Sequence, residues 1–528
     1  MQKWRITVNT KKKMRRPDIV YGNMYLSGIL RALIVALLVC VQILFIVCLS
    51  LAMTKYNIYF YFLLELASLI VIIALVNGNS STAFKMGWIS IVLILPLTGH
   101  IMYILWGNKN DSKENKKVNA KFNNACRYMM SEKEAKAKFI KEYPLLKRTS
   151  DYLSSEKLPL YKNNRIEYFS MGEKVFDKII ADMHNAKDFI LIEFFIVAEG
   201  QLWDKIHKVL LDKINEGVEV KLLYDDFGSM FRTNRYFKDD LIKEGFEVRE
   251  FNPIHKYLSQ LYFNYRTHQK IVVIDGNIGY TGGVNIGDEY VNIRNRFGIW
   301  KDNAVRIEGE ACYGLALTFL QMWDVSGNGP TIDYARYKPT KRFKENLSFC
   351  HIISDGPANN PTNPIENLYM QMMASAQKYL YITTPYLIIE EPMINELLIA
   401  ASSGIDVRII TPYIPDKKSV KLITNYNYGR LLKGGVKIYE YKPGFIHSKT
   451  ILNDNSAIVG SINMDYRSFY LHYECGAWMC DKKIVNTIRQ DFLKTVDESI
   501  EIKYEDWKNR PIYMKLFQSI LNLFQTLL

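Results

Sequence analysis

The chain has 528 residues, of which 48% are hydrophobic and 23% are charged, and its formal net charge is +14. This length predicts several domains, and this composition excludes both a disordered chain and one that is wholly embedded in lipid. The positive charge favours an anionic partner, which is either nucleic acid or an acidic lipid surface.

Three hydrophobic segments open the chain, at residues 32–53, 56–76 and 87–106. The first runs for 22 residues without a charge, which is long enough for a helix to cross a bilayer. The second carries a single charged residue, Glu65, and the third is interrupted by Pro96 and Gly99. Residues 1–107 are therefore predicted to be an N-terminal membrane anchor of transmembrane helices.

The basic residues around these segments bear on their orientation. Lysines and arginines precede the first segment, and Lys109, Lys113 and Lys116 follow the third, so the positive-inside rule favours the cytoplasm for both flanks. Three full spans cannot satisfy this rule, so either the third segment re-enters or one basic flank has been translocated. We expect a multi-pass protein of the cell membrane, with the rest of the chain on the cytoplasmic side.

The remainder of the chain reads as a duplication. A basic linker at 108–160 leads to a first copy at 161–325, and a polar linker at 326–348 leads to a second copy at 349–500. An amphipathic tail, 501–528, follows. Each copy predicts a strand, a helix and two more strands, at 188–197, 201–217, 218–226 and 243–251 in the first and at 378–388, 391–404, 405–413 and 433–441 in the second.

Glycines mark matching points of the two copies. Gly217 and Gly404 follow the predicted helices, where a left-handed residue often ends a helix. Gly245 and Gly435 lie in the turn that leads into the last predicted strand of each copy. The alternation of strands and helices predicts an α/β fold.

Each copy then delivers the same motif, His-x-Lys-x4-Asp, followed by glycine and asparagine. Its residues are His268, Lys270, Asp275 and Asn285 in the first copy and His447, Lys449, Asp454 and Asn463 in the second. Two occurrences at matching points are unlikely to be accidental. In a strand, residues two apart share a face, so each histidine lies beside its lysine. The other six histidines are assigned no role.

These residues resemble the phospholipase D superfamily, and within it the bacterial cardiolipin synthases. The stretches "RTHQKIVVIDGNIGYTGGVNIGDEY", "HSKTILND" and "GSINMDYRSF" are similar to sequence blocks of that family, in the expected order. Gln269 stands where the family usually has arginine, and His472 where it often has asparagine. The resemblance implies a duplicated phospholipase D-like α-β-α sandwich with a pseudo-twofold active site, preceded by the transmembrane helices.

The resemblance also implies a mechanism that suits an unactivated phosphodiester. His268 attacks phosphorus to form a phosphohistidine, and His447 donates a proton to the departing alcohol, then activates an incoming hydroxyl. Lys270 and Lys449 neutralise the phosphate oxygens. Asn285 and Asn463 are the expected amide donors to the same oxygens, and the glycines before them are interpreted as allowing close approach of the backbone to phosphate.

The carboxylates divide into two groups. Asp275 and Asp454 belong to the repeated motif, but their odd spacing from the histidine favours a structural role. By resemblance, Asp302 in "WKDN" and Glu474 in "HYEC" are the candidates that orient the histidines. No cofactor and no metal are expected, since no acidic cluster of metal-ligand type accompanies these residues and the seven cysteines form no CxxC pair.

The resemblance favours a synthase that joins two phosphatidylglycerol molecules into cardiolipin and releases glycerol. Its partners would be phosphatidylglycerol and anionic membrane lipids, with no nucleic acid. A phospholipase D-type hydrolase or another phosphatidyltransferase would use the same residues and stays open as an alternative. A membrane-bound nuclease would suit the net charge, but it has no need of three apolar segments.

Overall fold

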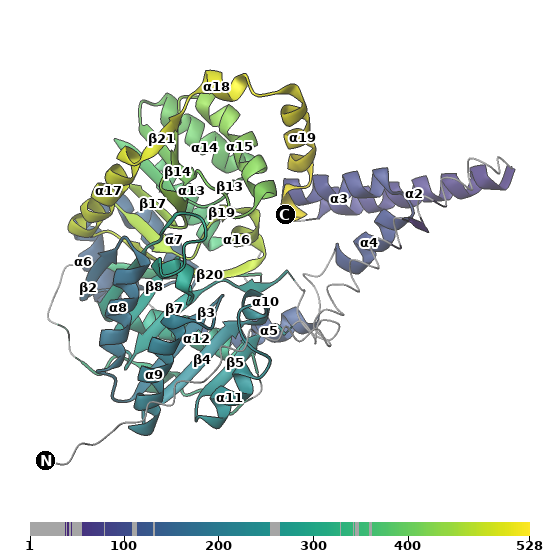
Figure 1. Ribbon diagram of the computed structural model, residues 1–528. Coiled ribbons are helices and arrows are strands. Elements are labelled where there is room, and N and C mark those ends of the chain that lie inside the picture. The colour runs from purple at the N-terminus through teal and green to yellow at the C-terminus, as the bar shows by residue number, and fades with distance from the viewer. Residues whose placement is uncertain are drawn as a thin grey trace, which may run out of the picture.

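The computed structural model in Figure 1 describes most of the chain. The described residues are 37, 40, 41, 44, 55–78, 80–107, 113–129, 132–253, 264–327, 329–341, 343, 348–357 and 362–527.

The first copy is built on a seven-stranded sheet. In spatial order its strands are β2 (Asn164–Phe169), β10 (Ala304–Gly309), β8 (Ile278–Gly282), β7 (Lys270–Ile274), β3 (Phe189–Phe194), β4 (Glu219–Asp225) and β5 (Glu247–Phe251). Its helices are α8 (Gly172–Met183), α9 (Gln201–Asn215), α10 (Asp226–Ser229), α11 (Phe237–Lys243) and α12 (Cys312–Val325).

The second copy carries a 10-stranded sheet of the same design. Its path runs through β1 (Leu160–Tyr161), β11 (Cys350–Asp355), β20 (His472–Met479), β18 (Ala457–Gly460), β17 (Thr450–Asn453), β12 (Tyr379–Thr383), β14 (Asp406–Pro412), β15 (Lys437–Tyr441) and β21 (Ser499–Ile502). The tenth strand, β6 (Arg266–Thr267), pairs with β20. Its helices are α13 (Pro364–Ala374), α14 (Glu391–Ser402), α15 (Lys418–Lys433), α16 (Tyr466–Tyr470) and α17 (Lys482–Asp497).

The duplication predicted from the sequence is confirmed element by element. The predicted strands, helices and strands are observed as β3, α9, β4 and β5 in the first copy and as β12, α14, β14 and β15 in the second. In both copies three of these strands run parallel and a β-hairpin, β7 with β8 or β17 with β18, completes the sheet centre. Gly217, Gly245, Gly404 and Gly435 all adopt positive φ, between 85° and 97°.

The two sheets face a shared core. On β3, Phe189 and Leu191 pack into a core that also contains Phe319 of α12 and Ile488 of α17. The alternate residues of β3, such as Ile190, face α8 and α9 on the outer side. Since both faces are covered, every residue of β3 is buried, including the charged Glu193. The copies are thus joined by hydrophobic packing between their sheets.

Short parallel pairings also tie the copies together. β6 of the first copy pairs with the start of β20 of the second, and β16 (Gly444–Ile446) pairs with β9 (Ile299–Lys301) of the first. A third such pair, β13 (Leu387–Ile388) with β19 (Met464–Asp465), lies within the second copy. The first two pairings position the site described below.

The stretch predicted as a basic linker, 108–160, is largely helical where it is described. It contains α5 (Lys113–Cys126), α6 (Lys133–Glu142), η1 (Pro144–Leu146) and α7 (Lys147–Ser155). Phe139, Leu146 and Leu153 from these helices are buried in the core of the second copy. The last residue of this stretch, Leu160, begins β1, which pairs with β11. The predicted boundary at 161 therefore falls inside a strand of the second sheet.

At the N-terminal end, α2 (Lys55–Asn77), α3 (Thr82–Ile94) and α4 (Thr98–Trp106) extend away from the two sheets (Figure 1). Within the residues that the structure describes, no helix combines the length and the apolar character that a bilayer crossing requires. The prediction of three transmembrane segments is therefore not supported. The segment 32–53 lies outside the described residues except for positions 37, 40, 41 and 44.

The third predicted segment, 87–106, is not one helix. Its residues fall in α3 and α4, with a break around Pro96, which has no backbone N–H to continue the ladder of hydrogen bonds. At Gly99 a Cβ atom would lie 2.6 Å from the carbonyl oxygen of Ile91, so only glycine allows α4 to turn back so closely against α3.

The C-terminal tail forms α18 (Tyr504–Lys508), α19 (Ile512–Leu523) and η5 (Gln525–Leu527). In Figure 1 α19 descends from the second copy and ends beside α3, and both α19 and η5 contact α3. Phe524 packs against a small cluster of Leu75, Trp88 and Ile91 from α2 and α3. The tail therefore connects the N-terminal helices to the second copy.

Candidate active site

The two motif histidines directly follow short strands that pair with strands of the other copy. His268 follows β6, and its backbone N–H donates to the carbonyl oxygen of Tyr473 on β20, at 2.8 Å. His447 follows β16, and its N–H donates to the carbonyl oxygen of Lys301 on β9, at 2.7 Å. Both imidazoles are more than nine-tenths buried.

Each histidine contacts a carboxylate that comes from the other copy. Nδ1 of His268 lies 2.9 Å from Oε1 of Glu474, and Nδ1 of His447 lies 2.6 Å from Oδ2 of Asp302. Both carboxylates have no exposed surface. A hydrogen bond at Nδ1 fixes the tautomer and leaves Nε2 as the nitrogen free to react.

Nearby side chains hold these carboxylates in place. The hydroxyl of Ser461 donates to Oε2 of Glu474, and the backbone N–H of Asn303 donates to Oδ1 of Asp302 at 2.9 Å. At Gly283 a Cβ atom would lie 2.1 Å from Oδ1 of Asp302 and 3.0 Å from the backbone oxygen of His447. Only glycine fits at position 283, because a Cβ atom there would collide with protein atoms of Asp302 and His447. This close packing keeps Asp302 near His447.

The two motif lysines are fully buried beside the histidines. Nζ of each lysine donates to the backbone oxygen of the histidine two residues before it, Lys270 to His268 and Lys449 to His447. Burial lowers the pKa of Lys270 to about 7 and that of Lys449 to about 8, although Glu474 and Asp302 partly offset this effect. Each of these lysines, when protonated, brings a positive charge into a buried site.

The histidines are neutral near pH 7 for a similar reason. Burial, with the nearby charges of Lys270 and Lys449, lowers the pKa of His268 well below its ordinary value. Burial and Lys449 lower the pKa of His447 to about 4, while Asp302 opposes the shift. Each histidine is sensitive to charges from both motifs, so the two form one electrostatic unit.

The two predicted phosphate-binding asparagines are both buried. Oδ1 of Asn285 accepts the backbone N–H of Ile196 at 3.1 Å. Oδ1 of Asn463 has no hydrogen-bond partner among the described residues. The free atom of Asn463 is an acceptor, whereas a contact with a phosphate oxygen would require the NH2 group of either side chain.

Aromatic rings line the surroundings of both histidines. Tyr290, Trp300 and Phe445 have ring centroids between 5.3 and 5.8 Å from that of His447, and Phe195 lies 5.1 Å from His268. These rings exclude water from the imidazoles, which strengthens the electrostatic interactions there.

The motif aspartates do not contact the histidines. The carboxylate of Asp275 accepts the backbone N–H groups of Lys187, Asp188 and Phe189, and that of Asp454 accepts those of Gln377 and Lys378. Asp275 lies at the far end of β7, roughly 16 Å from Lys270 at about 3.3 Å per residue. Each aspartate therefore stabilises, through backbone hydrogen bonds, the loop that precedes a central strand, β3 for Asp275 and β12 for Asp454.

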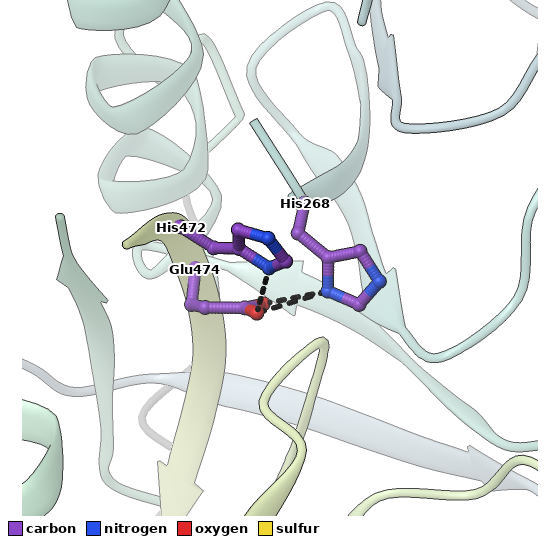
Figure 2. Close-up of side chains that lie close together, drawn as sticks. All are labelled: His268, His472 and Glu474. Carbon is purple, nitrogen blue, oxygen red and sulfur yellow. Dashed lines mark hydrogen bonds and ion pairs between the residues drawn. The ribbon is translucent and has the colours of Figure 1, made fainter. Parts of the chain in front are cut away.

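One further histidine, to which sequence reasoning assigned no role, stands beside the first motif histidine. His472 has its ring centroid 5.4 Å from that of His268, and its Nδ1 atom lies 3.7 Å from Oε1 of Glu474 (Figure 2). The available signal was its place two residues before Glu474 in a strand, which puts both side chains on one face.

Comparison with known proteins assigns the chain to a family. The family described as "Cardiolipin synthase, PLD-like domain" matches residues 179–323 and 369–496, which together are more than half of the chain. The chain belongs to this family of phospholipase D-like enzymes. A second family, described as "Phospholipase_D-nuclease N-terminal", matches residues 66–108. Each of the two matched segments of the first family contains one motif histidine, His268 or His447. Membership of this family makes the chain an enzyme of the phosphatidyltransferase class.

Named relatives cover nearly the whole chain. A cardiolipin synthase of Listeria monocytogenes is 33% identical over 88% of this chain and 99% of its own length. Cardiolipin synthase 1 of Staphylococcus aureus is 33% identical over 88% of this chain and 96% of its own. An uncharacterized protein of Streptococcus mutans is 35% identical over 87% of this chain and 99% of its own.

A solved structure shares the fold. The crystal structure of phosphatidylserine synthase from Haemophilus influenzae superimposes with a TM-score of 0.58 over 72% of this chain and 99% of that one, at 14% sequence identity. The mixed α/β phospholipase D-like fold predicted from the sequence is thus confirmed.

Proposed function

We propose that this enzyme transfers a phosphatidyl group from one phosphatidylglycerol to a second and releases glycerol, which yields cardiolipin. The observation that carries this proposal is the crosswise pair of histidines, each held at Nδ1 by a buried carboxylate of the other copy. Two imidazoles with free Nε2 atoms supply one nucleophile and one proton carrier, which a double displacement at phosphorus requires.

In the first step Nε2 of His268 attacks phosphorus, and the bond from phosphorus to the headgroup glycerol oxygen breaks. His447 donates the proton that this oxygen needs, so glycerol leaves and a phosphatidyl-histidine remains. The strongly lowered pKa of His268 supports its role as the neutral nucleophile. The shorter contact of His447 with Asp302, 2.6 Å, suits a histidine that must carry positive charge.

In the second step His447 removes a proton from a headgroup hydroxyl of another phosphatidylglycerol. That oxygen attacks phosphorus, the bond from phosphorus to nitrogen breaks, and His268 is restored. Because His447 is neutral in the free site, its proton must be stabilised by the arriving anionic phosphate. Lys270, Lys449, Asn285 and Asn463 are assigned to the phosphate oxygens, where they stabilise the charge of the transition state.

Asp275 and Asp454 receive a structural role in this proposal, since each binds backbone amides of a loop. Loss of either carboxylate would displace the strand that carries the neighbouring lysine and thus act on catalysis indirectly. Glu474 and Asp302 are assigned as the residues that orient and stabilise the two imidazoles.

We further propose that the N-terminal helices and α19 hold the enzyme at a membrane. The helix α19 buries the polar Gln518 but leaves 83% of Ile512 and 64% of Leu516 exposed. A helix on the surface of a protein in water instead buries its apolar residues and exposes its polar ones. On α2, Phe62, Leu63, Leu66, Leu69, Ile70, Ile73 and Val76 are likewise exposed. Exposed apolar side chains on α2 and on α19, in a chain of charge +14, suit an anionic lipid surface.

The facing of the catalytic unit is proposed to be cytoplasmic. The lysines of α5 come soon after α4 in the chain. Positively charged segments next to a membrane anchor stay preferentially on the cytoplasmic side. The substrate, phosphatidylglycerol, would be taken from the adjoining leaflet.

The reaction is tested by incubating the purified protein in detergent with phosphatidylglycerol alone and identifying the lipid product by mass spectrometry. Cardiolipin with an equal amount of glycerol supports the proposal. Because one phosphodiester replaces another, excess glycerol added to enzyme and cardiolipin should regenerate phosphatidylglycerol.

Other outcomes would name other functions. If phosphatidic acid is the main product in both directions, water is the natural acceptor and the enzyme is a phospholipase D. Another phosphatidyl acceptor, found by offering other alcohols, would identify a different phosphatidyltransferase. Cleavage of DNA without any change in the lipid would identify a nuclease.

A further inference from the structure

The side chains of His268, His472 and Glu474 converge on one small volume, as Figure 2 shows. Each offers one ligand atom, and the three atoms lie within 4.8 Å of one another. The separations from Oε1 of Glu474 are 2.9 Å to Nδ1 of His268 and 3.7 Å to Nδ1 of His472. The two imidazoles come from different copies, while His472 and Glu474 share one face of β20.

This geometry is close to what a tetrahedral metal ion needs. Zinc binds imidazole nitrogen and carboxylate oxygen at about 2.0–2.2 Å, so two of its ligand atoms lie roughly 3.4 Å apart. The two measured separations, 2.9 and 3.7 Å, fall on either side of this value. Small rotations of the side chains would therefore suffice to admit an ion.

His472 supplies a second, independent sign of a ligand. Its Nδ1 atom is buried, and the Glu474 oxygen that it faces lies 3.7 Å away, which is too long for a normal hydrogen bond. Leaving a buried polar atom without a partner costs free energy, so such an atom calls for an explanation. A metal ion between the two imidazoles would satisfy it.

We propose that His268, His472 and Glu474 form an inhibitory site for a divalent transition-metal ion of the zinc type. The ion bonds to Nδ1 of His268, Nδ1 of His472 and a carboxylate oxygen of Glu474, and it leaves one coordination position open. The proton that His268 holds at Nδ1 moves to Nε2. That nitrogen then has no free electron pair with which to attack phosphorus.

The surroundings limit the strength of this site. Lys270 and Lys449 place positive charge near His268, and they oppose a cation. The site is thus suited to reversible inhibition and not to a permanently bound ion. Metal binding itself does not depend on the proposed reaction, whereas the inhibition rests on His268 being the nucleophile.

Binding is tested without reference to activity. Co2+ as a probe should give the visible absorption of a low-coordinate site when it is added to the full-length protein in detergent, and Zn2+ should abolish that absorption by displacement. The His472→Asn variant should lose the signal. An exposed histidine at the end of α8 provides the matched control, since His184→Asn removes an imidazole far from the site and should keep it.

Inhibition is tested with the lipid assay on the same proteins. Zn2+ should inhibit the parent protein, and His472→Asn should raise the inhibitory concentration roughly tenfold or more while turnover without metal is retained. His472→Cys, which keeps a zinc ligand, should remain sensitive. Mg2+ at the same concentration should not inhibit, because it prefers oxygen ligands, and this excludes an effect through lipid phosphates.

The outcomes separate two failures. If Co2+ gives no absorption, or if His472→Asn and the parent respond alike to Zn2+, the metal site is wrong. If Co2+ binds through His472 but Zn2+ leaves turnover unchanged, the site exists and the assignment of His268 as nucleophile is overturned.

Discussion

Nδ1 of His268 lies 2.9 Å from the carboxylate of Glu474, although the two residues come from different copies of the duplicated unit and stand 206 positions apart. The same relationship joins His447 to Asp302 in the opposite direction. The orientation of either imidazole thus requires both copies to be folded and correctly docked.

The first prediction concerns these carboxylates. Glu474→Gln and Asp302→Asn should preserve the fold but permit the wrong imidazole tautomer, so kcat should fall by about 10²- to 10⁴-fold. The measurement is cardiolipin formation at saturating phosphatidylglycerol, with thermal unfolding as the control. Near-normal kcat in either variant would show that its histidine needs no orienting acid.

The second prediction concerns the histidines themselves. His268→Ala and His447→Ala should each abolish turnover, because they remove different obligatory steps. With labelled phosphatidylglycerol and rapid acid-free quenching, a covalent lipid adduct should be absent from His268→Ala. An adduct that persists in His268→Ala would transfer the role of nucleophile to another residue.

The third prediction uses the lowered pKa values of the two lysines. In the free enzyme Lys270 and Lys449 lose their protons as pH rises through about 7 and about 8, so kcat/KM should decline over this range. The bound phosphate favours the charged lysines, so kcat should decline only at higher pH. A Lys449→Arg variant stays charged at position 449, so the part of the decline near pH 8 should disappear while the part near pH 7, which comes from Lys270, should remain. A profile that is flat to strongly alkaline pH would argue against these values.

The fourth prediction tests the close packing at Gly283. Gly283→Ala places a methyl group against Asp302 and the backbone of His447, so activity should drop at least about a hundredfold, as for loss of a preorganised catalytic contact. Gly287→Ala is the matched control, because its nearest contact is the end of the Glu289 side chain at 3.3 Å. Equal activities would mean that Asp302 can move without cost.

The fifth prediction concerns facing. Lys117→Cys, in α5, should resist a membrane-impermeant thiol reagent in intact cells and react after lysis, with the parent chain as the background control. Ready labelling of intact cells would place the catalytic unit outside the cytoplasm.

The repeated motif and the pattern of strands and helices could be predicted because they are local in the sequence. Gly217 and Gly404, for example, mark helix ends by a backbone conformation that glycine adopts without strain. The family resemblance indicated Asp302 and Glu474 as the orienting carboxylates, but which of them meets which histidine could not be predicted, since that depends on how the two copies dock. The break in 87–106 was indicated by Pro96, whereas the burial of Phe139 from the expected linker had no comparable signal.

The exchange of carboxylates also bears on how such a protein can evolve. A duplicated gene segment usually leaves one half free to change while the other keeps the function. Here a substitution of Asp302 in the first half removes the hydrogen-bond partner of His447 in the second half. A substitution of Glu474 likewise removes the partner of His268. Neither half can become a passive scaffold, and an ancestor with one copy could have assembled the full set only by pairing with a second molecule of itself.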